Sequence, residues 1–218
     1  MFDFGNLIQI LARLPVMLLA ITVHEYAHGF VSYKLGDPTA KYSGRLSLNP
    51  LSHLDPIGAL CMIFFRFGWA KPVPINPMYY NNRKRDTAIV SLAGPVANVT
   101  LAFLSGIILA LYSCFLESFI WAPLSAFIIE VFFELAMVNI SFAVFNLIPF
   151  PPLDGSKILG ALLPQDKYMA LLQYERFGFP VLIILSVTGL LGRVLSLVAD
   201  PLYSVWWSML NGLCALFS

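Results

Sequence analysis

The sequence predicts an all-α membrane protein, built as a polytopic bundle of transmembrane helices. Of the 218 residues, 59% are hydrophobic and only 11% are charged, whereas soluble domains carry roughly a quarter charged residues. The chain therefore has too little polar surface to coat a water-soluble fold, and we expect the lipid bilayer to be its main solvent. No basic tract interleaved with aromatic residues occurs, so nucleic acid is not an expected partner.

Four apolar stretches reach the length of about 20 residues that a helix needs to span a bilayer. The first is apolar through Val23 and then meets a charged, histidine-bearing segment instead of a small-residue cleavage site, so we expect no cleavable signal peptide. A further stretch, 202–217, is short and carries Trp206 and Trp207; a spanning helix and an interfacial helix both fit it. The four predicted spans are 7–35, 87–115, 121–147 and 177–198, the last ended by Asp200-Pro201.

A long segment rich in Pro, Gly and Asn, residues 36–86, separates the first two predicted spans. Its apolar centre, residues 57–67, is too short to cross a bilayer unaided. Non-helical backbone at membrane depth is tolerated only where protein or a water-filled cavity covers it. We therefore expect a re-entrant loop or a small β-sheet, packed against the helices, in this segment.

The distribution of Lys and Arg predicts the orientation, because basic residues concentrate in cytoplasmic loops. They are dense between the first two spans and present between the third and fourth, whereas the link around Glu117 has none. We expect a multi-pass protein of the cell inner membrane or plasma membrane with its amino terminus outside; Arg13 opposes this orientation but is outnumbered. The residues counted are Lys34, Lys41, Arg45, Arg66, Lys71, Arg83, Lys84, Arg85, Lys157, Lys167 and Arg176.

Residues His24-Glu25-Tyr26-Ala27-His28 read HExxH within the first span. On a helix, positions i and i+4 share a face, so both imidazoles can meet one metal ion while the adjacent glutamate points towards a water on it. Two neutral His nitrogens suit Zn²⁺, which leaves a position open for water and lowers the pKa of that water to roughly 7. Glu25 can then take a proton during attack on a peptide carbonyl and pass it to the leaving amine.

The position of this motif favours a metal site over a chance match. Three ionisable groups lie in an otherwise apolar helix, where each costs roughly 2–3 kcal/mol by insertion scales, and such residues are functional by default. His28 precedes Lys34 by about 9 Å at 1.5 Å per residue. We therefore expect the active site a short way into the bilayer from the cytoplasmic side.

A hydrolytic zinc site usually takes three protein ligands, and Asp154 is the strongest candidate for the third. It follows a turn containing Pro149, Pro151 and Pro152, which prevents regular helix and can aim the carboxylate inward. Gly155 after it permits a tight turn. The local pattern is equally typical of a helix N-cap at Asp154, so both interpretations stand at this point.

Other ionisable residues are weaker candidates for the third ligand. His53 is the only other histidine, with Asp55 beside it, and an alternative role for His53 is to support the ligands or to anchor its loop. Glu130 and Glu134 lie four residues apart in the third span, so they share a helix face. We expect them to face a polar cavity or the outer boundary of the membrane.

Three motifs together carry a resemblance to a known family. HEYAH at 24–28 in an apolar helix and NLIPFPPLDG at 146–155 after a later span resemble the site-2 protease family of intramembrane metalloproteases. AGPVAN at 93–98 looks like the AGPxxN signature of that family on the intervening span. The order and spacing of the motifs are similar to the three-helix catalytic core of the family, over about 7–163. The chain resembles a minimal branch without a PDZ or other accessory domain.

The resemblance implies a role for each matching position. His24, His28 and Asp154 would be the zinc ligands and Glu25 the catalytic acid and base, which decides between the two interpretations of Asp154. The remaining matches imply supporting roles: Asn146, Pro149, Pro151, Pro152 and Gly155 in positioning the substrate, Gly94 and Pro95 in close helix packing or local unwinding, and Asn98 as a polar core residue.

Together these observations predict one integral-membrane metalloprotease domain over residues 1–218, with a catalytic core at about 7–163 and C-terminal helices at 174–218. With one Zn²⁺ ion it would hydrolyse peptide bonds of transmembrane or membrane-associated proteins. The segment 36–86 is expected to pair with an unwound substrate by β-augmentation. The alternatives are a zinc or ion transporter, since intramembrane His and Asp also mark ion paths, and a catalytically inactive membrane chaperone. The sequence predicts neither the substrate nor the oligomeric state.

Overall fold

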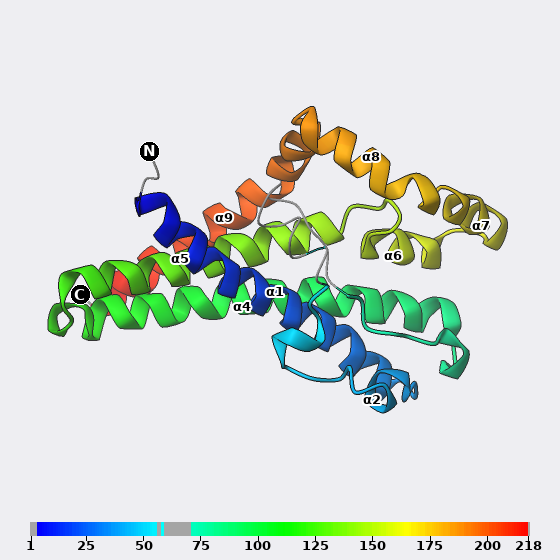
Figure 1. Cartoon of the computed structure of the whole chain (residues 1–218), viewed down its shortest axis with the longest axis horizontal. Helices are drawn as coiled ribbons and strands as arrows, with labels where there is room; N and C mark the ends of the chain where they lie inside the picture. Colours follow the sequence, from blue (N-terminus) through cyan, green and yellow to red (C-terminus); the bar gives the residue numbers. More distant parts are fainter. Residues whose placement is uncertain (1–3, 56–57, 59–70, 218) are drawn as a thin grey trace.

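The computed structural model describes residues 4–55, 58 and 71–217, and this part of the chain folds into helices joined by turns, with no strand among the described residues (Figure 1). Four long helices carry most of the structure, and shorter helices gather at one end. In chain order they are α1 (Phe4–Lys34), α2 (Thr39–Tyr42), η1 (Pro50–Ser52), η2 (Pro77–Tyr79), α4 (Arg83–Phe115), η3 (Glu117–Phe119), α5 (Ala122–Asn146), α6 (Asp154–Leu162), α7 (Gln165–Gln173), α8 (Glu175–Val187) and α9 (Leu190–Phe217).

Helices α4 and α5 form an antiparallel hairpin, closed by the short turn η3. Among the described residues, these two helices are long and apolar enough to cross a membrane, and a third span is counted if the bent pair α7 and α8 forms one. Small residues on facing surfaces, Ala102 on α4 and Ala136 on α5, are fully buried and let the two backbones approach. The predicted spans 87–115 and 121–147 are thus confirmed as apolar helices.

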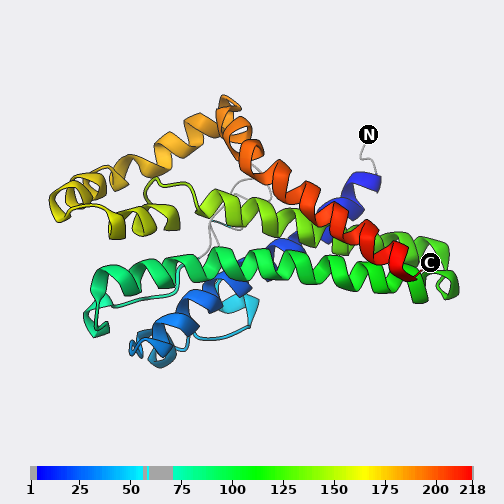
Figure 2. The same cartoon turned by 180° about the vertical axis from the view of Figure 1, so that it is seen from behind.

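Helix α1 crosses the hairpin obliquely and contacts both of its helices (Figures 1 and 2). It coincides with the predicted first span, and its buried Ala20 lies against α4, where the carbonyl accepts a hydrogen bond from Asn98 at 3.0 Å. Nearer its amino end, Arg13 forms an ion pair with Glu134 of α5 at 2.8 Å. The face of α1 that carries HExxH is therefore held against α4 and α5.

The prediction of a fourth span at 177–198 is wrong. Helix α8 ends at Val187, and Gly189 with φ +72° breaks the chain direction before α9 begins at Leu190. The predicted stop at Asp200-Pro201 is wrong as well, because α9 continues through Pro201 to Phe217. The stretch 202–217 is thus the second half of a helix of 28 residues and not a separate short element.

Packing of Trp206 explains why α9 continues. Trp206 is fully buried in a core cluster shared by α4, α5 and α9, and its indole Nε1 donates to the carbonyl of Ala102 at 2.9 Å. The ring lies directly over Gly106, where an added Cβ would stand 2.5 Å from Nε1. Burial of so large a side chain stabilises the second half of α9 along the hairpin.

The segment between α1 and α4 is described only in part. Residues 59–70, which include most of the predicted apolar centre at 57–67, lie outside the described residues, so the re-entrant loop or small β-sheet stays a prediction. The described flanks contain α2, the turns η1 and η2, and residues 71–76, which are neither helix nor strand. We call residues 71–76 the strap, because they run beside α1.

Replacing Gly106 with Ala is expected to lower the free energy of unfolding by about 1–3 kcal/mol, the usual cost of overpacking a filled core. The new methyl group would overlap the buried Trp206 ring, so the ring or the helix backbone would have to shift. Thermal unfolding of the purified protein in detergent measures the change. Gly212→Ala on α9 is the matched control, because nothing lies within 4 Å of its added Cβ; equal effects of both variants would contradict the packing described above.

Candidate metal centre

Two histidines of α1 turn their side chains into the interior of the helix bundle. His24 is 2% and His28 6% exposed, and their ring centroids lie 4.5 Å apart with the planes nearly perpendicular. This arrangement follows from the spacing of four residues, which places both side chains on one face of a helix. The Nε2 atoms of the two rings are 2.9 Å apart.

Helix α4 fixes the orientation of both rings from the opposite side. Nδ1 of His28 lies 2.7 Å from the backbone carbonyl oxygen of Val90, and Nδ1 of His24 lies 2.6 Å from Oδ1 of Asn98. The amide nitrogen of Asn98 donates to the oxygens of Ala20 and Asn139, at 3.0 and 2.6 Å, which leaves its Oδ1 for His24. Since both partners are acceptors, each Nδ1 carries the proton and each Nε2 presents a lone pair.

Gly94 lies between these two contacts on α4 and makes the close approach of the histidines possible. A Cβ at this position would stand 2.5 Å from Nε2 of His28 and 2.7 Å from Nε2 of His24. Any side chain there would occupy the space in which the two nitrogens meet. The next residue, Pro95, lies inside a continuous helix, so close packing describes this pair better than local unwinding.

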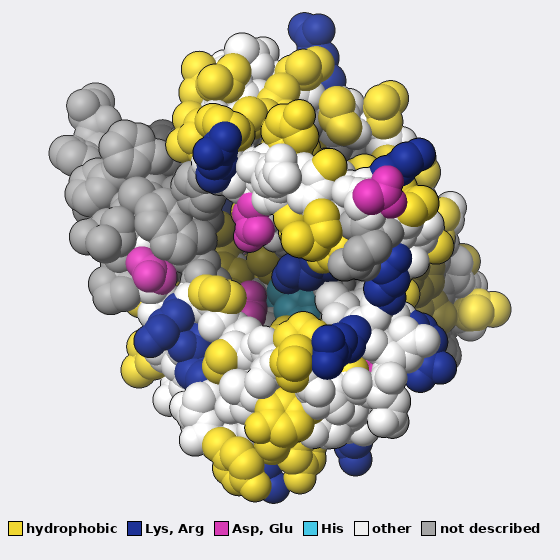
Figure 3. Space-filling view, turned by 90° about the vertical axis from the view of Figure 1, so that its right-hand side faces the viewer, with side chains coloured by type: hydrophobic (Ala, Val, Ile, Leu, Met, Phe, Trp, Pro, Cys, Tyr) yellow, Lys and Arg dark blue, Asp and Glu magenta, His cyan; other side chains and the backbone are white. Residues whose placement is uncertain are grey.

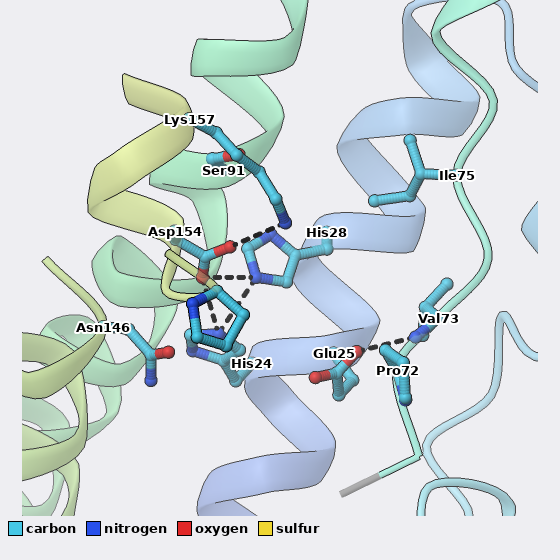
Figure 4. Close-up of a pocket in the computed structure, with 11 residues that line it drawn as sticks. His24, Glu25, His28, Pro72, Val73, Ile75, Ser91, Asn146, Asp154 and Lys157 are labelled. Carbon is cyan, nitrogen blue, oxygen red and sulfur yellow. Dashed lines mark hydrogen bonds and ion pairs between the residues drawn. The ribbon is translucent and has the colours of Figure 1, made fainter. Parts of the chain in front are cut away.

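Asp154 reaches the histidines from the first turn of α6. Its Oδ2 atom is 3.1 Å from Nε2 of His24 and 3.0 Å from Nε2 of His28, and the residue is 7% exposed (Figure 4). The N-cap interpretation of Asp154 is wrong, because Leu153 occupies that position and no side chain caps the helix. Lys157, one turn further on, lies 3.4 Å from the other carboxylate oxygen.

The turn before Asp154 packs so closely on the start of α6 that Gly155 has no room for a side chain. A Cβ on Gly155 would stand 2.2 Å from the carbonyl oxygen of Leu147. The peptide between Pro151 and Pro152 is cis, and Pro151 is fully buried. Helix α8 also packs closely against the turn, because an added Cβ on Gly178 would stand 2.3 Å from the oxygen of Pro151.

The three converging atoms fit a cation. Nε2 of His24, Nε2 of His28 and Oδ2 of Asp154 all present lone pairs, and no proton is available between them while the imidazoles are neutral. Such a group is repulsive when buried unless a positive charge lies at its centre. Among the described residues, His24, His28 and Asp154 form the one cluster of this kind able to hold a metal ion. Two imidazole nitrogens and a carboxylate form a donor set typical of catalytic zinc.

The cluster lies at the floor of a hollow of about 160 Å³ at one end of the molecule. Figure 3 shows histidine at the bottom of this hollow, with acidic and basic side chains around the opening. A polar hollow at the end of a set of apolar helices can admit water to the metal centre. The lining residues are His24, Glu25, His28, Pro72, Val73, Ile75, Ser91, Asn146, Pro152, Asp154 and Lys157.

Glu25 stands on the other side of the hollow from Asp154 and belongs to the lining but not to the cluster of ligand atoms (Figure 4). One of its oxygens, Oε2, accepts a hydrogen bond from the backbone N–H of Val73 in the strap at 2.8 Å. The other carboxylate of the hollow, Asp154, is held by the histidines and Lys157. The two acidic groups thus have separate partners.

Buried polar groups beyond the end of α1 anchor the strap. Asp37 is fully buried and accepts hydrogen bonds from Ser32 Oγ at 2.8 Å and from the backbone N–H of Asn76 at 2.7 Å. Burial opposes ionisation, but the hydrogen bonds from Asn76, Thr39 and Ser32 outweigh it, so the pKa of Asp37 lies below its ordinary value. Burial also raises the pKa of Tyr80, which shares the hydroxyl of Ser32, to about 12.

The other residues singled out from the sequence lie in several places. Asn146 and Pro152 line the hollow, whereas Pro149 is exposed and outside its lining. His53 does not belong to the metal cluster: its Nε2 lies 2.8 Å from the oxygen of Ser47, which fits an anchor for its loop. The cluster does not include Glu130 or Glu134. Asp55 is not part of it either, and accepts a hydrogen bond from the backbone N–H of Gly58.

Sequence reasoning missed Asn139, Val73 and Lys157. Asn139 is fully buried in α5 and orients Asn98, and a lone Asn in an apolar helix is the one signal that pointed to it. Val73 acts through its backbone, for which the residue type gives no signal. Lys157 follows Asp154 at the spacing of one helical turn, and this spacing alone could have placed it beside the carboxylate.

Comparison with known proteins identifies the family. The chain is 38% identical over 198 residues to YwhC of Bacillus subtilis (strain 168), by its name a candidate zinc metalloprotease, covering 89% of this chain and 84% of that protein. The model of peptidase family M50 matches residues 116–187, which include Asp154 but not HExxH. The chain belongs to peptidase family M50, the site-2 proteases.

Two further relatives are similar over most of this chain. Rip2 of Mycolicibacterium smegmatis, also a candidate zinc metalloprotease by name, is 31% identical over 181 residues, which cover 81% of this chain and 66% of that protein. Zinc metalloprotease MJ0392 of Methanocaldococcus jannaschii is 26% identical over 192 residues, covering 86% of this chain and 45% of that protein. No solved structure matches the chain significantly.

Membership of family M50 and the donor set agree on the cofactor. The relatives are named as zinc metalloproteases, and the cluster of two imidazoles and one carboxylate suits that ion. Zn²⁺ is therefore the cofactor of this M50 protein, and its apolar helices α4 and α5 make it a membrane protein.

Replacing Gly94 with Ala is expected to abolish stoichiometric zinc binding, because the methyl group would fill the space between the two Nε2 atoms. The ratio of zinc to protein after purification measures the effect. Gly192→Ala is the control, since the same change there meets nothing within 4 Å. Full zinc occupancy in Gly94→Ala would show that the rings do not converge as described.

Replacing Asn98 with Ala is expected to weaken zinc binding about 10- to 100-fold, the usual effect of removing a group that orients a metal ligand. His24 would lose the acceptor that keeps the proton on Nδ1. Competition with a chelator of known affinity gives the zinc dissociation constant. Ser105→Ala is the matched control on the same helix, because Ser105 is equally buried but bonds only to Ala102; an equal loss there would contradict the prediction.

Proposed function

We propose that the chain is an intramembrane zinc metallopeptidase that hydrolyses peptide bonds of transmembrane or membrane-associated proteins. The observation that carries the proposal is the hollow at one end of the apolar helices. Three zinc-ligand atoms converge on its floor, and a carboxylate that is not part of that cluster stands at its side. An acid or base beside a metal site, but separate from the ligands, is the arrangement that hydrolysis of an amide requires.

In this proposal His24, His28 and Asp154 hold the ion, which polarises a substrate carbonyl and lowers the pKa of a water when bound. Glu25 removes a proton from the attacking water and delivers it to the leaving amine nitrogen. Asn98 and the carbonyl of Val90 keep both histidines in the tautomer whose Nε2 is free for the metal. Lys157 holds one oxygen of Asp154, so that the other faces the histidines.

A helical substrate must unwind before its carbonyl groups are accessible, because they are otherwise hydrogen-bonded within the helix. The strap lies along the hollow, and its Pro72, Val73 and Ile75 are part of the lining. We propose that an unwound stretch of substrate lies against the segment 36–86 by β-augmentation. Asn146 and Pro152 line the hollow on the side of the ligand Asp154 and would contact the same stretch.

Orientation and location are part of the proposal. Basic residues Lys34, Lys41, Arg45 and Lys71 lie in the chain between the end of α1 and the strap that lines the hollow, and such residues favour the cytoplasmic side. The metal centre would then lie near the cytoplasmic surface of the cell inner membrane or plasma membrane. Residues 1–218 would act as one multi-pass domain, with its catalytic core at about 7–163.

The decisive experiment compares Glu25→Gln with Asp154→Ala. Glu25→Gln is expected to keep stoichiometric zinc and to lose at least about 100-fold in turnover, since general acid–base catalysis contributes about 10²–10⁴-fold. Asp154→Ala is expected to lose the zinc itself. Cleavage of fluorescently labelled casein in detergent and the zinc-to-protein ratio give the two readings.

The outcomes of this comparison separate the proposal from its alternatives. Zinc transport by reconstituted protein that persists in Glu25→Gln would favour a carrier, which has no need for a base between the histidines. Unchanged proteolysis in Glu25→Gln would refute the proposed role of this residue. Absence of proteolysis in the zinc-loaded wild type towards any membrane protein offered would favour an inactive chaperone.

A further inference from the structure

We propose that the backbone N–H of Val73 is a positioning group that keeps Glu25 out of the metal coordination shell and available as a base. The inference rests on the proposed function of Glu25. It concerns a question that the HExxH pattern leaves open, namely what prevents a carboxylate next in sequence to a zinc ligand from binding the zinc itself. Carboxylate oxygens are good zinc ligands, so a specific restraint is needed.

The first observation is that Glu25 lies apart from the ligand cluster although it lines the same hollow. The atoms of His24, His28 and Asp154 lie within 4.8 Å of one another, and Glu25 is not part of that group. Its Oε2 accepts the N–H of Val73 at 2.8 Å. Figure 4 shows this bond on the side of α1 that faces the strap, away from Asp154.

The second observation is that the strap is held at both ends, so its central amide is a rigid donor. At one end the guanidinium of Arg45 donates to the carbonyl of Lys71 at 2.6 Å, and the N–H of Lys71 donates to the carbonyl of His53 at 2.9 Å. At the other end the N–H of Asn76 donates to the buried carboxylate of Asp37 at 2.7 Å. Val73 itself is only 6% exposed.

The third observation concerns the residues on either side of Val73. Pro72 and Pro74 have no N–H, so Val73 supplies the one amide hydrogen within residues 72–74. A residue that precedes proline is restricted to extended conformations, and therefore the N–H of Val73 has a fixed direction. The sequence of this part of the strap thus leaves a single donor and aims it at Glu25.

These observations give the carboxylate two competing partners, the amide and the metal. A hydrogen bond to a carboxylate in a partly buried site is strong enough to hold one oxygen in place. With Oε2 held by the strap, Glu25 would stay beside the three ligand atoms without joining them. Without that bond, the carboxylate is free to turn and become a fourth protein ligand.

Val73→Pro tests the inference, because it removes the amide hydrogen in a stretch whose neighbours are already proline. We expect opposite changes in two measurements: zinc affinity rises roughly 10-fold, since a ligand is gained, and kcat towards fluorescently labelled casein falls about 10- to 100-fold, since the base is lost. The absorption spectrum of the Co²⁺-substituted protein is expected to change as well. Val73→Ala, which keeps the N–H and shortens the side chain, is the matched control.

A double variant identifies the group responsible for the gain in zinc affinity. In Val73→Pro/Glu25→Gln the affinity is expected to return to that of Glu25→Gln alone, because the amide side chain is a poor zinc ligand. If Val73→Pro does not fold, Arg45→Met decides the matter: it frees the carbonyl of Lys71 without changing residue 73, and it is expected to shift affinity and turnover in the same opposite directions.

Other results would overturn the inference. If affinity and turnover fall together in Val73→Pro, or in Arg45→Met where that variant decides, the strap only maintains the fold of the hollow. If Val73→Pro behaves like Val73→Ala, the hydrogen bond has no role in positioning. Full turnover in Glu25→Gln would instead refute the proposed function, and that result does not depend on any change at Val73.

Discussion

The metal centre depends on a constraint on two protons. His24 and His28 can offer lone pairs to one ion only while their protons reside on Nδ1, and helix α4 supplies an acceptor for each of these protons. In a buried site a wrong tautomer would place a hydrogen between the ligands and leave an acceptor on α4 unpaired. The amide chain from Asn139 through Asn98 makes one arrangement much more favourable than the other.

The same face of α4 both orients the ligands and makes room for them. Val90, Gly94 and Asn98 follow one another at intervals of four residues, so they form a single line along the helix. The outer two bind the histidine rings, and the glycine between them leaves the space in which the nitrogens meet. Close packing of α1 on α4 is therefore a requirement of the chemistry as well as of the fold.

The sequence predicted features that arise from local spacing and composition. The pairing of His24 with His28 follows from helix periodicity, and the helices at 87–115 and 121–147 follow from continuous apolar runs. Asp154 could be chosen over an N-cap only through the resemblance, because its partners are 126 and 130 residues away. The helix break at Gly189 and the continuation of α9 through Pro201 were not predicted, because apolar composition alone does not show where a helix is interrupted. Long-range packing of Trp206 decides that question.

The contact between Gly178 and Pro151 joins helix α8 to the turn that precedes the metal cluster. Even a methyl group would not fit between α8 and the oxygen of Pro151, so α8 and the turn are in direct van der Waals contact. From the buried Pro151 the chain reaches Asp154 within three residues. Any displacement of α8 towards this turn would therefore have to move the turn itself, so the position of α8 is coupled to the position of the Asp154 carboxylate.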